Sequence, residues 1–222
     1  MNWAIVPVKP LLLGKSRLAS VVPPTSRAII NRIMLERTLT VLRSTEAIAE
    51  ILVISRDPEV LAIAREFQAK TLLEQSGSQL NPALERATAV VASYKPKGLL
   101  IIPADLPLLD VDDVLSIIFA VDSSPAVVLA PDRHEQGTNA LFAIPPGKIP
   151  YLFGPNSFYE HRRVAQERGI DPIVVRRQAL ELDLDLPEDL ELLRELHRTD
   201  HKPLLDAISA QLPVVSSPEE AR

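Results

Sequence analysis

The sequence predicts an α/β fold, with a mostly parallel but mixed sheet that has helices on both faces. In the first half of the chain, short apolar runs alternate with segments whose apolar residues recur at helical spacing, which is typical of strand–helix–strand crossovers. In the second half, pairs of adjacent strands interrupt this alternation and indicate a mixed sheet there. The 222 residues are 46% hydrophobic, with no internal repeat and no linker, so we expect one domain.

Each element of the first half follows from a local pattern. The apolar run 2–8 predicts the first strand, and a loop over 9–19 leads to a helix over 23–43 with Thr25 or Ser26 as its N-cap. The apolar face of this helix is expected to contain Ile29, Ile30, Ile33, Met34, Leu39 and Leu42. The later expected elements are strands at 50–55, 70–75 and 98–103, and helices at 57–68, 81–94 and 110–121.

The second half predicts paired strands between helices. The expected strands are 126–131, 140–145, 172–177 and 179–185, and the expected helices are 157–169 and 186–197. From residue 199 onward the hydrophobic pattern weakens. We therefore expect the domain to span 1–198 and residues 199–222 to form a loosely ordered tail.

Composition excludes several classes of function. A formal net charge of −5 and 4% aromatic residues argue against a nucleic-acid partner. The absence of cysteine excludes disulfides, thiolate nucleophiles and cysteine-ligated zinc. The sequence has no run of about 18 uncharged apolar residues, so no membrane span is predicted. The N-terminus also lacks the pattern of a signal peptide. We expect a soluble, cytoplasmic protein that does not bind membranes.

The first loop concentrates positive charge at the edge of the sheet where ligands are expected. In open parallel sheets, ligands bind outside the carboxyl ends of the strands. Lys9, Lys15 and Arg17 follow the first strand and would suit a polyphosphate. The segment 14–16 (GKS) resembles the end of a Walker A motif. The first glycine of that motif would fall at position 9, which is Lys9 and is followed by Pro10, so a P-loop is not predicted. A solvated basic loop is the alternative interpretation.

Three aspartates are the candidate metal ligands. Asp105 follows the most apolar strand, between Pro103 and Pro107. In the expected strand 179–185, Asp183 and Asp185 would share one face because side chains alternate with a period of two. Carboxylates this close repel one another unless a cation or a proton lies between them. Together they indicate a site for Mg²⁺, and exposed aspartates on an edge strand are the alternative.

Two further polar segments offer groups to an anion. Gly137, Thr138 and Asn139 precede a strand, and could provide backbone N–H groups and a hydroxyl. Gly154 and Ser157 precede a helix, where Ser157 would either act as the N-cap or help the helix N-terminus to hold an anion. His161 lies one turn further and is expected on the same side. His134, His197 and His201 are interpreted as surface residues.

The motifs AIVPVKPLLLGKSRLA, PADLPLL, GTNALFAIPP, FGPNSFYEH and LDLDLPEDL together resemble the guanylyltransferases of coenzyme F-420 biosynthesis, which act on phosphoenolpyruvate or 2-phospho-L-lactate. The resemblance covers roughly residues 2 to 197. It implies a Rossmann-like nucleotidyltransferase domain similar to the GT-A glycosyltransferases and the molybdenum-cofactor nucleotidyltransferases. The glycine-rich first loop of the latter is absent here.

The resemblance also assigns roles. It implies that Asp105, Asp183 and Asp185 hold Mg²⁺, and that Thr138, Gly154 and Ser157 bind the acceptor. Nucleotide binding is implied for Lys9, Lys15, Arg17 and, in the region that receives guanine, Asn81. The catalytic residues would be Lys15, Arg17 and Asp105.

The expected reaction joins GTP to a three-carbon phosphate. An ionised phosphate oxygen of the acceptor would attack the α-phosphorus and displace diphosphate, so catalysis needs positioning and charge neutralisation rather than a protein nucleophile. Phosphoenolpyruvate is the favoured acceptor, with 2-phospho-L-lactate and 3-phosphoglycerate as alternatives, and the next enzyme of the pathway is a candidate partner. Two other functions are weighed: a glycosyltransferase that uses a sugar nucleotide, and a non-catalytic GTP-binding partner.

Overall fold

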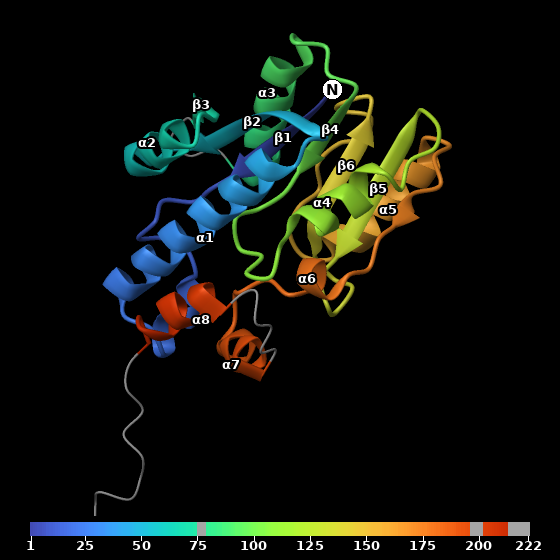
Figure 1. Cartoon of the computed structure of the whole chain (residues 1–222). Helices are drawn as coiled ribbons and strands as arrows, with labels where there is room; N and C mark the ends of the chain where they lie inside the picture. The colour runs from blue at the N-terminus through green and yellow to red at the C-terminus, as the bar shows by residue number, and fades with distance from the viewer. Residues whose placement is uncertain (75–78, 196–201, 213–222) are drawn as a thin grey trace, which may run out of the picture.

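The computed structural model describes residues 1–74, 79–195 and 202–212, which form a seven-stranded sheet between two layers of helices (Figure 1). The strands are β1 (Asn2–Pro7), β2 (Ile48–Ser55), β3 (Lys70–Leu73), β4 (Gly98–Ile101), β5 (Ala126–Pro131), β6 (Thr138–Ile144) and β7 (Ile173–Val174). Their order in the sheet is β3-β2-β1-β4-β6-β5-β7. Among the described strands, only β6 runs antiparallel to its two neighbours, β4 and β5. The predicted mixed, mostly parallel sheet is confirmed.

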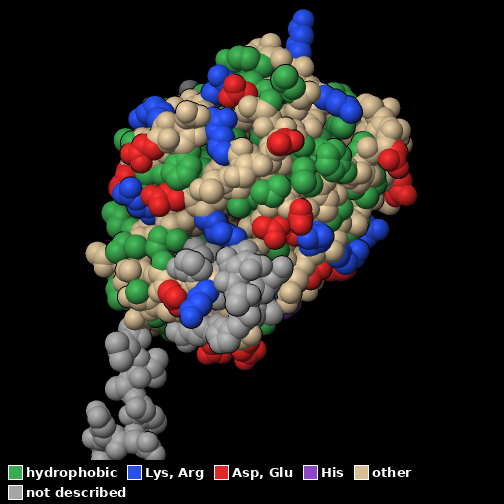
Figure 2. All heavy atoms as spheres, in the orientation of Figure 1, with side chains coloured by type: hydrophobic (Ala, Val, Ile, Leu, Met, Phe, Trp, Pro, Cys, Tyr) green, Lys and Arg blue, Asp and Glu red, His purple; other side chains and the backbone are tan. Residues whose placement is uncertain are grey.

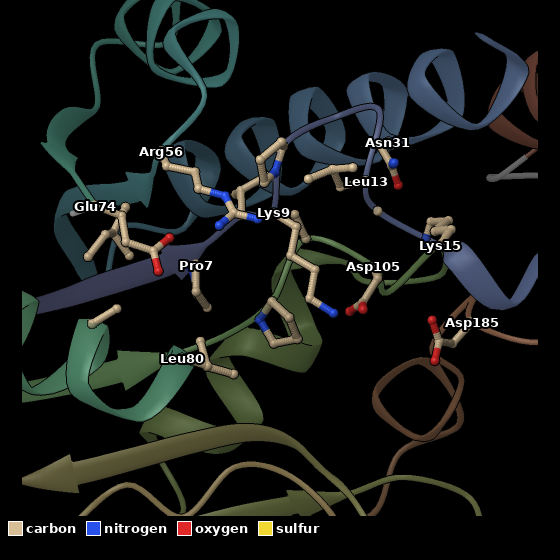
Figure 3. Close-up of a pocket in the computed structure, with 17 residues that line it drawn as sticks. Pro7, Lys9, Leu13, Lys15, Asn31, Arg56, Glu74, Leu80, Asp105 and Asp185 are labelled. Carbon is tan, nitrogen blue, oxygen red and sulfur yellow. The ribbon is translucent and has the colours of Figure 1, made fainter. Parts of the chain in front are cut away.

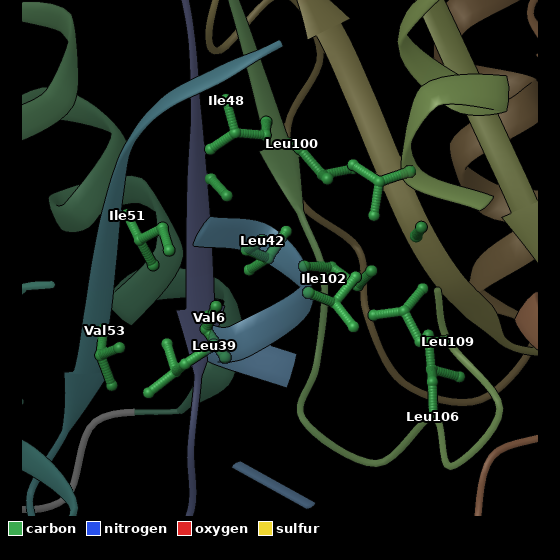
Figure 4. Packing of buried hydrophobic residues seen from close by; sticks show 14 of the residues in the cluster. Val6, Leu39, Leu42, Ile48, Ile51, Val53, Leu100, Ile102, Leu106 and Leu109 are labelled. Carbon is green, nitrogen blue, oxygen red and sulfur yellow. The ribbon is translucent and has the colours of Figure 1, made fainter. Parts of the chain in front are cut away.

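The helices that cover the sheet are amphipathic, and each buries one face. One face of the sheet packs against α1 (Pro24–Ser44), α2 (Pro58–Glu66) and α4 (Val111–Ile118), and Figure 4 shows Leu39 and Leu42 of α1 against strand residues of this core. The other face packs against α3 (Leu80–Ala92) and α5 (Ser157–Glu167). Full burial of one aliphatic side chain stabilises the fold by about 1.5–3 kcal/mol, so these two layers fix the strands firmly.

The start of α1 differs from the prediction. The N-cap is Pro23, no side chain caps the helix, and Pro24 occupies the first helical position, which suits proline because its missing N–H has no partner there. Thr25 and Ser26 therefore lie inside the first turn, and their prediction as N-cap was wrong. Ile29, expected on the apolar face, is 44% exposed.

Two predicted strands after α5 are wrong or too long. The segment 172–177 pairs with β5 only at β7, Ile173–Val174. The segment 179–185 is not a strand: it begins in the short helix α6 (Gln178–Glu181) and continues as an extended chain. Gln, Ala, Leu and Glu favour helix over strand. The alternation of Leu and Asp that predicted a strand instead marks a segment whose leucines are buried.

The C-terminal elements form a small third core beside α1. Two helices, α7 (Pro187–Glu195) and α8 (Lys202–Ser209), contribute Leu190, Leu193 and Ile208 to it, and the 3-10 helix η1 (Ser16–Ser20) contributes Leu18. The sequence predicted α7 but placed the α8 residues in the tail. Within the described residues, no helix is both long and apolar enough to cross a membrane.

The strand directions bring several loops to one edge of the sheet. Because β1, β2, β4 and β5 all run in the same direction, their carboxyl ends meet there, and the antiparallel β6 starts at the same edge. The loop after β1, the turn after β4 and the connection from β5 to β6 are therefore neighbours, as the sequence analysis expected. On the molecular face shown in Figure 2, basic and acidic side chains are interspersed rather than gathered by sign.

Candidate active site

Two adjoining cavities lie at this edge of the sheet. The first has a volume of about 530 Å³ and lies between the loop after β1, the ends of β2 and β4, and the start of α3 (Figure 3). The second, of about 610 Å³, reaches from the same loop to the connection between β5 and β6 and the N-terminus of α5. Residues that line both cavities are Pro7, Lys9, Lys15, Leu80, Pro103, Asp105 and Asp185. Their shared wall therefore carries both cations and carboxylates.

The structure brings all but one of the candidate site residues to these cavities. The cavity walls include Lys9, Lys15, Arg17, Asp105, Thr138, Gly154, Ser157, Asp183 and Asp185. Asn81 is the exception. Its Nδ2 donates to the Phe153 carbonyl at 3.1 Å, and its Oδ1 accepts from the Phe153 N–H at 2.9 Å. Asn81 thus holds Phe153 at the wall of the second cavity, whereas its predicted contact with guanine stays a prediction.

Asp105 is a half-buried residue on a braced turn, and its Oδ1 atom is fully buried. Arg37 of α1 donates to the carbonyls of Pro107 and Leu109 at 3.1 and 2.9 Å, which fixes the backbone just after Asp105. Burial raises the pKa of Asp105, while the neighbouring charge of Lys15 acts in the opposite direction. Among the described residues, Asp105 Oδ1 is buried without a hydrogen-bond partner. A buried oxygen of this kind is available for a cation.

Lys15 lies between the carboxylates in a strained backbone conformation. Its φ of 52° is left-handed, which is uncommon for a residue with a Cβ and costs roughly 1 kcal/mol. Its Nζ donates to the Leu184 carbonyl at 2.6 Å. Burial lowers the pKa of Lys15, although the nearby aspartates, Asp105 first among them, act in the opposite direction. The ammonium group is therefore held at the junction of the two cavities.

The extended segment 182–186 presents the other two aspartates without belonging to a strand. The Leu184 N–H donates to the Asp105 carbonyl at 2.9 Å, so this segment is hydrogen-bonded directly to the turn after β4. Leu182 and Leu184 are buried, while Asp183 and Asp185 are partly exposed at the second cavity. Arg17 contacts Asp185 at 2.6 Å, but its side chain is 68% exposed, so this ion pair contributes little to stability.

Asp189, which was not among the predicted site residues, fixes this segment. Its Oδ2 accepts from the N–H groups of Asp185 and Leu186 at 2.9 and 2.6 Å, and its Oδ1 contacts Arg133 at 2.8 Å. The Arg133 N–H donates to the Glu181 carbonyl at 3.0 Å. One buried carboxylate therefore ties the aspartate segment to the connection between β5 and β6. An acidic residue in the first turn of a helix that begins with proline is the signal that could have revealed it.

Replacing Asp189 with asparagine is expected to lower the free energy of unfolding by about 2 kcal/mol. The amide oxygen can still accept from both N–H groups, but the amide nitrogen would then face the Arg133 guanidinium. Urea unfolding monitored by circular dichroism measures the loss. Glu188→Gln is the matched control because Glu188 is the exposed neighbour in the same turn. Equal stability of the two variants would contradict this role for Asp189.

The three predicted metal ligands surround the second cavity without forming a closed ligand set. In the part of the chain that the structure describes, no three His, Cys, Asp or Glu side chains are close enough together to hold a metal ion. Burial, followed by the charge of Asp105, raises the pKa of Asp183 to about 6. The carboxylate oxygens of the three aspartates repel one another, and Asp105 Oδ1 has no hydrogen-bond partner among the described residues. Oxygen atoms of this kind are the ligands that a hard divalent cation such as Mg²⁺ prefers.

The connection between β5 and β6 is organised by one aspartate. Asp132 Oδ1 accepts from the N–H groups of His134 and Gln136 at 3.1 and 2.9 Å, and Oδ2 accepts from the Gly137 N–H at 2.9 Å. A Cβ on Gly137 would lie 2.9 Å from that same oxygen, so a larger residue here would force the Asp132 side chain to shift. The turn delivers Thr138 to the second cavity. His134 is exposed, as predicted, whereas His197 and His201 lie outside the described residues.

The N-terminus of α5 forms the opposite wall of the second cavity. Its N-cap is Asn156 in the left-handed conformation, and Gly154 has a φ of 138°, which only glycine adopts readily. Ser157 is the first helical residue rather than the cap, and it is buried. The Phe158 N–H donates to the Gln136 carbonyl at 3.1 Å and joins this helix to the preceding turn. The wall therefore combines a helix N-terminus with a buried hydroxyl, a combination suited to an anion.

His161 lies behind this wall and contacts it through both ring nitrogens. Nδ1 lies 3.0 Å from Thr138 Oγ1, and Nε2 accepts from the Leu152 N–H at 2.9 Å. The ring is fully buried and meets the edge of the Phe153 ring. Burial lowers the pKa of His161 to about 4, well below its usual value near 6.5.

This burial predicts a pH-dependent contribution to stability. Because the folded-state pKa lies below the unfolded-state pKa, the unfolded chain binds a proton first as the pH falls. The stability that neutral His161 contributes is complete above about pH 6.5 and decreases by about 3 kcal/mol as the pH falls to 4. Urea unfolding from pH 7 to 4 should show the difference in stability between wild type and His161→Gln changing by this amount. A constant difference between wild type and His161→Gln across this pH range would contradict the prediction.

Comparison with known proteins gives a consistent match along the chain. The family model described as "Guanylyl transferase CofC like" matches residues 2–215. A phosphoenolpyruvate guanylyltransferase of Rubrobacter xylanophilus is 40% identical over 201 residues, which cover 90% of this chain and 97% of that protein. A 3-phospho-D-glycerate guanylyltransferase of Colwellia psychrerythraea is 34% identical over 189 residues, which cover 85% of this chain and 89% of that protein.

Solved structures share the fold at low sequence identity. A structure from Desulfovibrio desulfuricans G20 described as a nucleotide-diphospho-sugar transferase has a TM-score of 0.70 and 15% identity, and the match covers 95% of this chain and 97% of that chain. A CMP:2-keto-3-deoxy-manno-octonic acid synthetase complexed with CTP has a TM-score of 0.57 and 13% identity, with 88% and 97% covered. These likenesses confirm the predicted nucleotidyltransferase type of fold.

Proposed function

This chain belongs to the CofC-like guanylyl transferase family, and on that premise we propose that it transfers the guanylyl group of GTP to the phosphate of phosphoenolpyruvate, with release of diphosphate. The single observation that carries the proposal is the pair of cavities with a common wall of Lys9, Lys15, Asp105 and Asp185. Two anionic substrates can each occupy one cavity and meet at that wall.

The first cavity suits the nucleotide. It is lined by apolar side chains of the first loop and of α3, which can contact a base, and by Lys9 and Lys15, which can contact a polyphosphate. The second cavity suits the acceptor because Thr138, Ser157 and the N-terminus of α5 offer hydrogen-bond donors to a carboxylate or phosphate.

Charge neutralisation and positioning supply the catalysis in this proposal. An acceptor phosphate oxygen forms a bond to the α-phosphorus of GTP while the bond from that phosphorus to the bridging oxygen of the diphosphate breaks. In this scheme Lys15 would neutralise charge at the junction, and Lys9, which also lines both cavities, would hold the departing diphosphate. Asp105, Asp183 and Asp185 would hold Mg²⁺, which supplies further neutralisation of phosphate charge when bound.

An acceptor panel tests the function. Purified protein with Mg²⁺ and GTP is offered phosphoenolpyruvate, each enantiomer of 2-phospholactate, or 3-phospho-D-glycerate, and the diphosphate released is measured. We expect release with phosphoenolpyruvate to exceed that with each alternative by at least about tenfold in kcat/KM, which corresponds to about 1.4 kcal/mol of differential transition-state binding. No release with any of these acceptors would overturn the proposal, and a preference for another acceptor would correct it.

A further inference from the structure

The two hydrogen bonds of His161 determine which nitrogen of its ring carries the proton. The Leu152 N–H donates to Nε2 at 2.9 Å, so Nε2 must supply a lone pair. A neutral imidazole that accepts at Nε2 carries its hydrogen on Nδ1. The atom that faces Nδ1, at 3.0 Å, is Thr138 Oγ1. His161 therefore donates and the Thr138 hydroxyl oxygen accepts.

The surroundings of the ring keep it in this neutral form. His161 is fully buried, and Phe153 meets it edge-on with ring centroids 4.9 Å apart. Burial lowers the pKa of His161 to about 4, while the charge of Glu160 acts in the opposite direction. A doubly protonated ring would also place an Nε2 hydrogen against the Leu152 N–H. At neutral pH the direction of the hydrogen bond to Thr138 is consequently fixed.

This direction has a consequence for the second cavity. A hydroxyl oxygen that accepts from His161 keeps its own hydrogen available for donation. Among the described residues, Thr138 Oγ1 has no hydrogen-bond partner besides His161, and Thr138 lines the cavity together with Ser157 and Gly154. Thr138 is 6% exposed, so its side chain has little freedom to turn elsewhere.

We propose that His161 is a positioning residue that commits the Thr138 hydroxyl to donate a hydrogen bond to an anionic group of the acceptor. The inference rests on the proposed function, because the acceptor is what the second cavity would hold. His161 itself does not line either cavity and has no direct contact with substrate in this scheme. Its effect should therefore depend entirely on Thr138.

Two substitutions separate the two hydrogen bonds of the ring. In His161→Asn, the amide nitrogen takes the place of Nδ1 and can still donate to Thr138, while the contact with the Leu152 N–H is lost. In His161→Gln, the amide oxygen can reach the place of Nε2 and accept from Leu152, while the donor to Thr138 is lost. We expect His161→Gln to raise the KM for phosphoenolpyruvate about tenfold with the KM for GTP unchanged, and His161→Asn to recover most of that loss.

A double-variant cycle with Thr138→Val tests whether His161 acts through Thr138. Thr138→Val removes the hydroxyl at nearly constant volume and is expected to raise the KM for phosphoenolpyruvate about tenfold by itself. Adding His161→Gln to this variant should cause no further increase, because the group that His161 positions is already absent. A further increase by the full factor seen in the wild-type background would overturn the inference and leave His161 with a merely structural role.

A spectroscopic measurement tests the proton position independently of turnover. Nitrogen-15 chemical shifts of labelled His161 at pH 7, assigned by comparison with His161→Gln, distinguish a ring protonated at Nδ1 from one protonated at Nε2. Protonation at Nδ1 supports the inference, and protonation at Nε2 overturns it whatever the substrate. If the wild type shows the expected tautomer but no turnover with any acceptor, the proposed function fails and this inference fails with it. Normal turnover with additive KM effects overturns this inference alone.

Discussion

Replacing Asp105 with asparagine is expected to lower kcat for guanylyl transfer about a thousandfold while leaving the free energy of unfolding unchanged or slightly higher. Asparagine has nearly the same shape, so the turn held by Arg37 keeps its geometry. Burial already raises the pKa of Asp105, which means that its charge is unfavourable to the folded protein itself. The negative charge of Asp105 would therefore act on a bound ligand, and its loss should lower kcat rather than the free energy of unfolding.

Initial rates of diphosphate release, with urea unfolding in parallel, measure the two expectations for Asp105→Asn. Asp122→Asn makes the same change at an exposed position after α4 and should leave both quantities unaltered. A titration with Mg²⁺ adds a second readout, since a weakened cation site should shift the half-maximal concentration upward. Near-normal turnover by a folded Asp105→Asn protein would exclude a metal-binding role.

The second large effect is expected for Lys15. Its replacement by methionine keeps the length and most of the apolar stem but removes the charge at the junction of the cavities. We expect kcat to fall by about two to three orders of magnitude, because no other cation lines both cavities as deeply buried as Lys15 within the described residues. The Leu184 carbonyl also loses its partner, so a loss of about 2 kcal/mol in the free energy of unfolding should accompany it.

Lys97→Met is the matched control for Lys15→Met, because Lys97 is exposed just before β4, at the opposite end of that strand from Asp105. Kinetics are compared at a temperature where urea unfolding shows both variants to be fully folded. A kcat within tenfold of wild type for folded Lys15→Met would refute the assignment of Lys15 to the transition state.

Local patterns predicted the sheet because each strand is a short apolar run that ends at a turn signal. The strand 126–131 agrees with β5 residue for residue. Because ligands bind at the carboxyl ends of parallel strands, the sequence also predicted Asp105 beside the first loop. The segment 179–185 was misread because alternation of Leu and Asp reports only which side chains are buried. It does not report whether the backbone pairs with a strand or, as for Leu184, with the Asp105 carbonyl.

The parts of the site that could not be predicted depend on contacts between distant backbone groups. The proton position of His161 is decided by the Leu152 N–H, which no spacing in the sequence links to it. The family resemblance implies nucleotide binding for Asn81, which stays a prediction, but the two hydrogen bonds of its amide to the Phe153 backbone carry no signal in the sequence. Asp189 belonged to a recognised motif, but only the fold shows that it joins two separate loops through Arg133.

The reversal of strand direction at β6 divides the sheet into two halves that meet at the catalytic junction. The half from β3 to β4 carries the first cavity, and the half from β6 to β7, with α5, carries the donors of the second. Substitutions away from the shared wall can reshape one cavity with little effect on the other. Under the proposed assignment of the nucleotide to the first cavity and the acceptor to the second, the choice of acceptor can therefore change while nucleotide binding is kept.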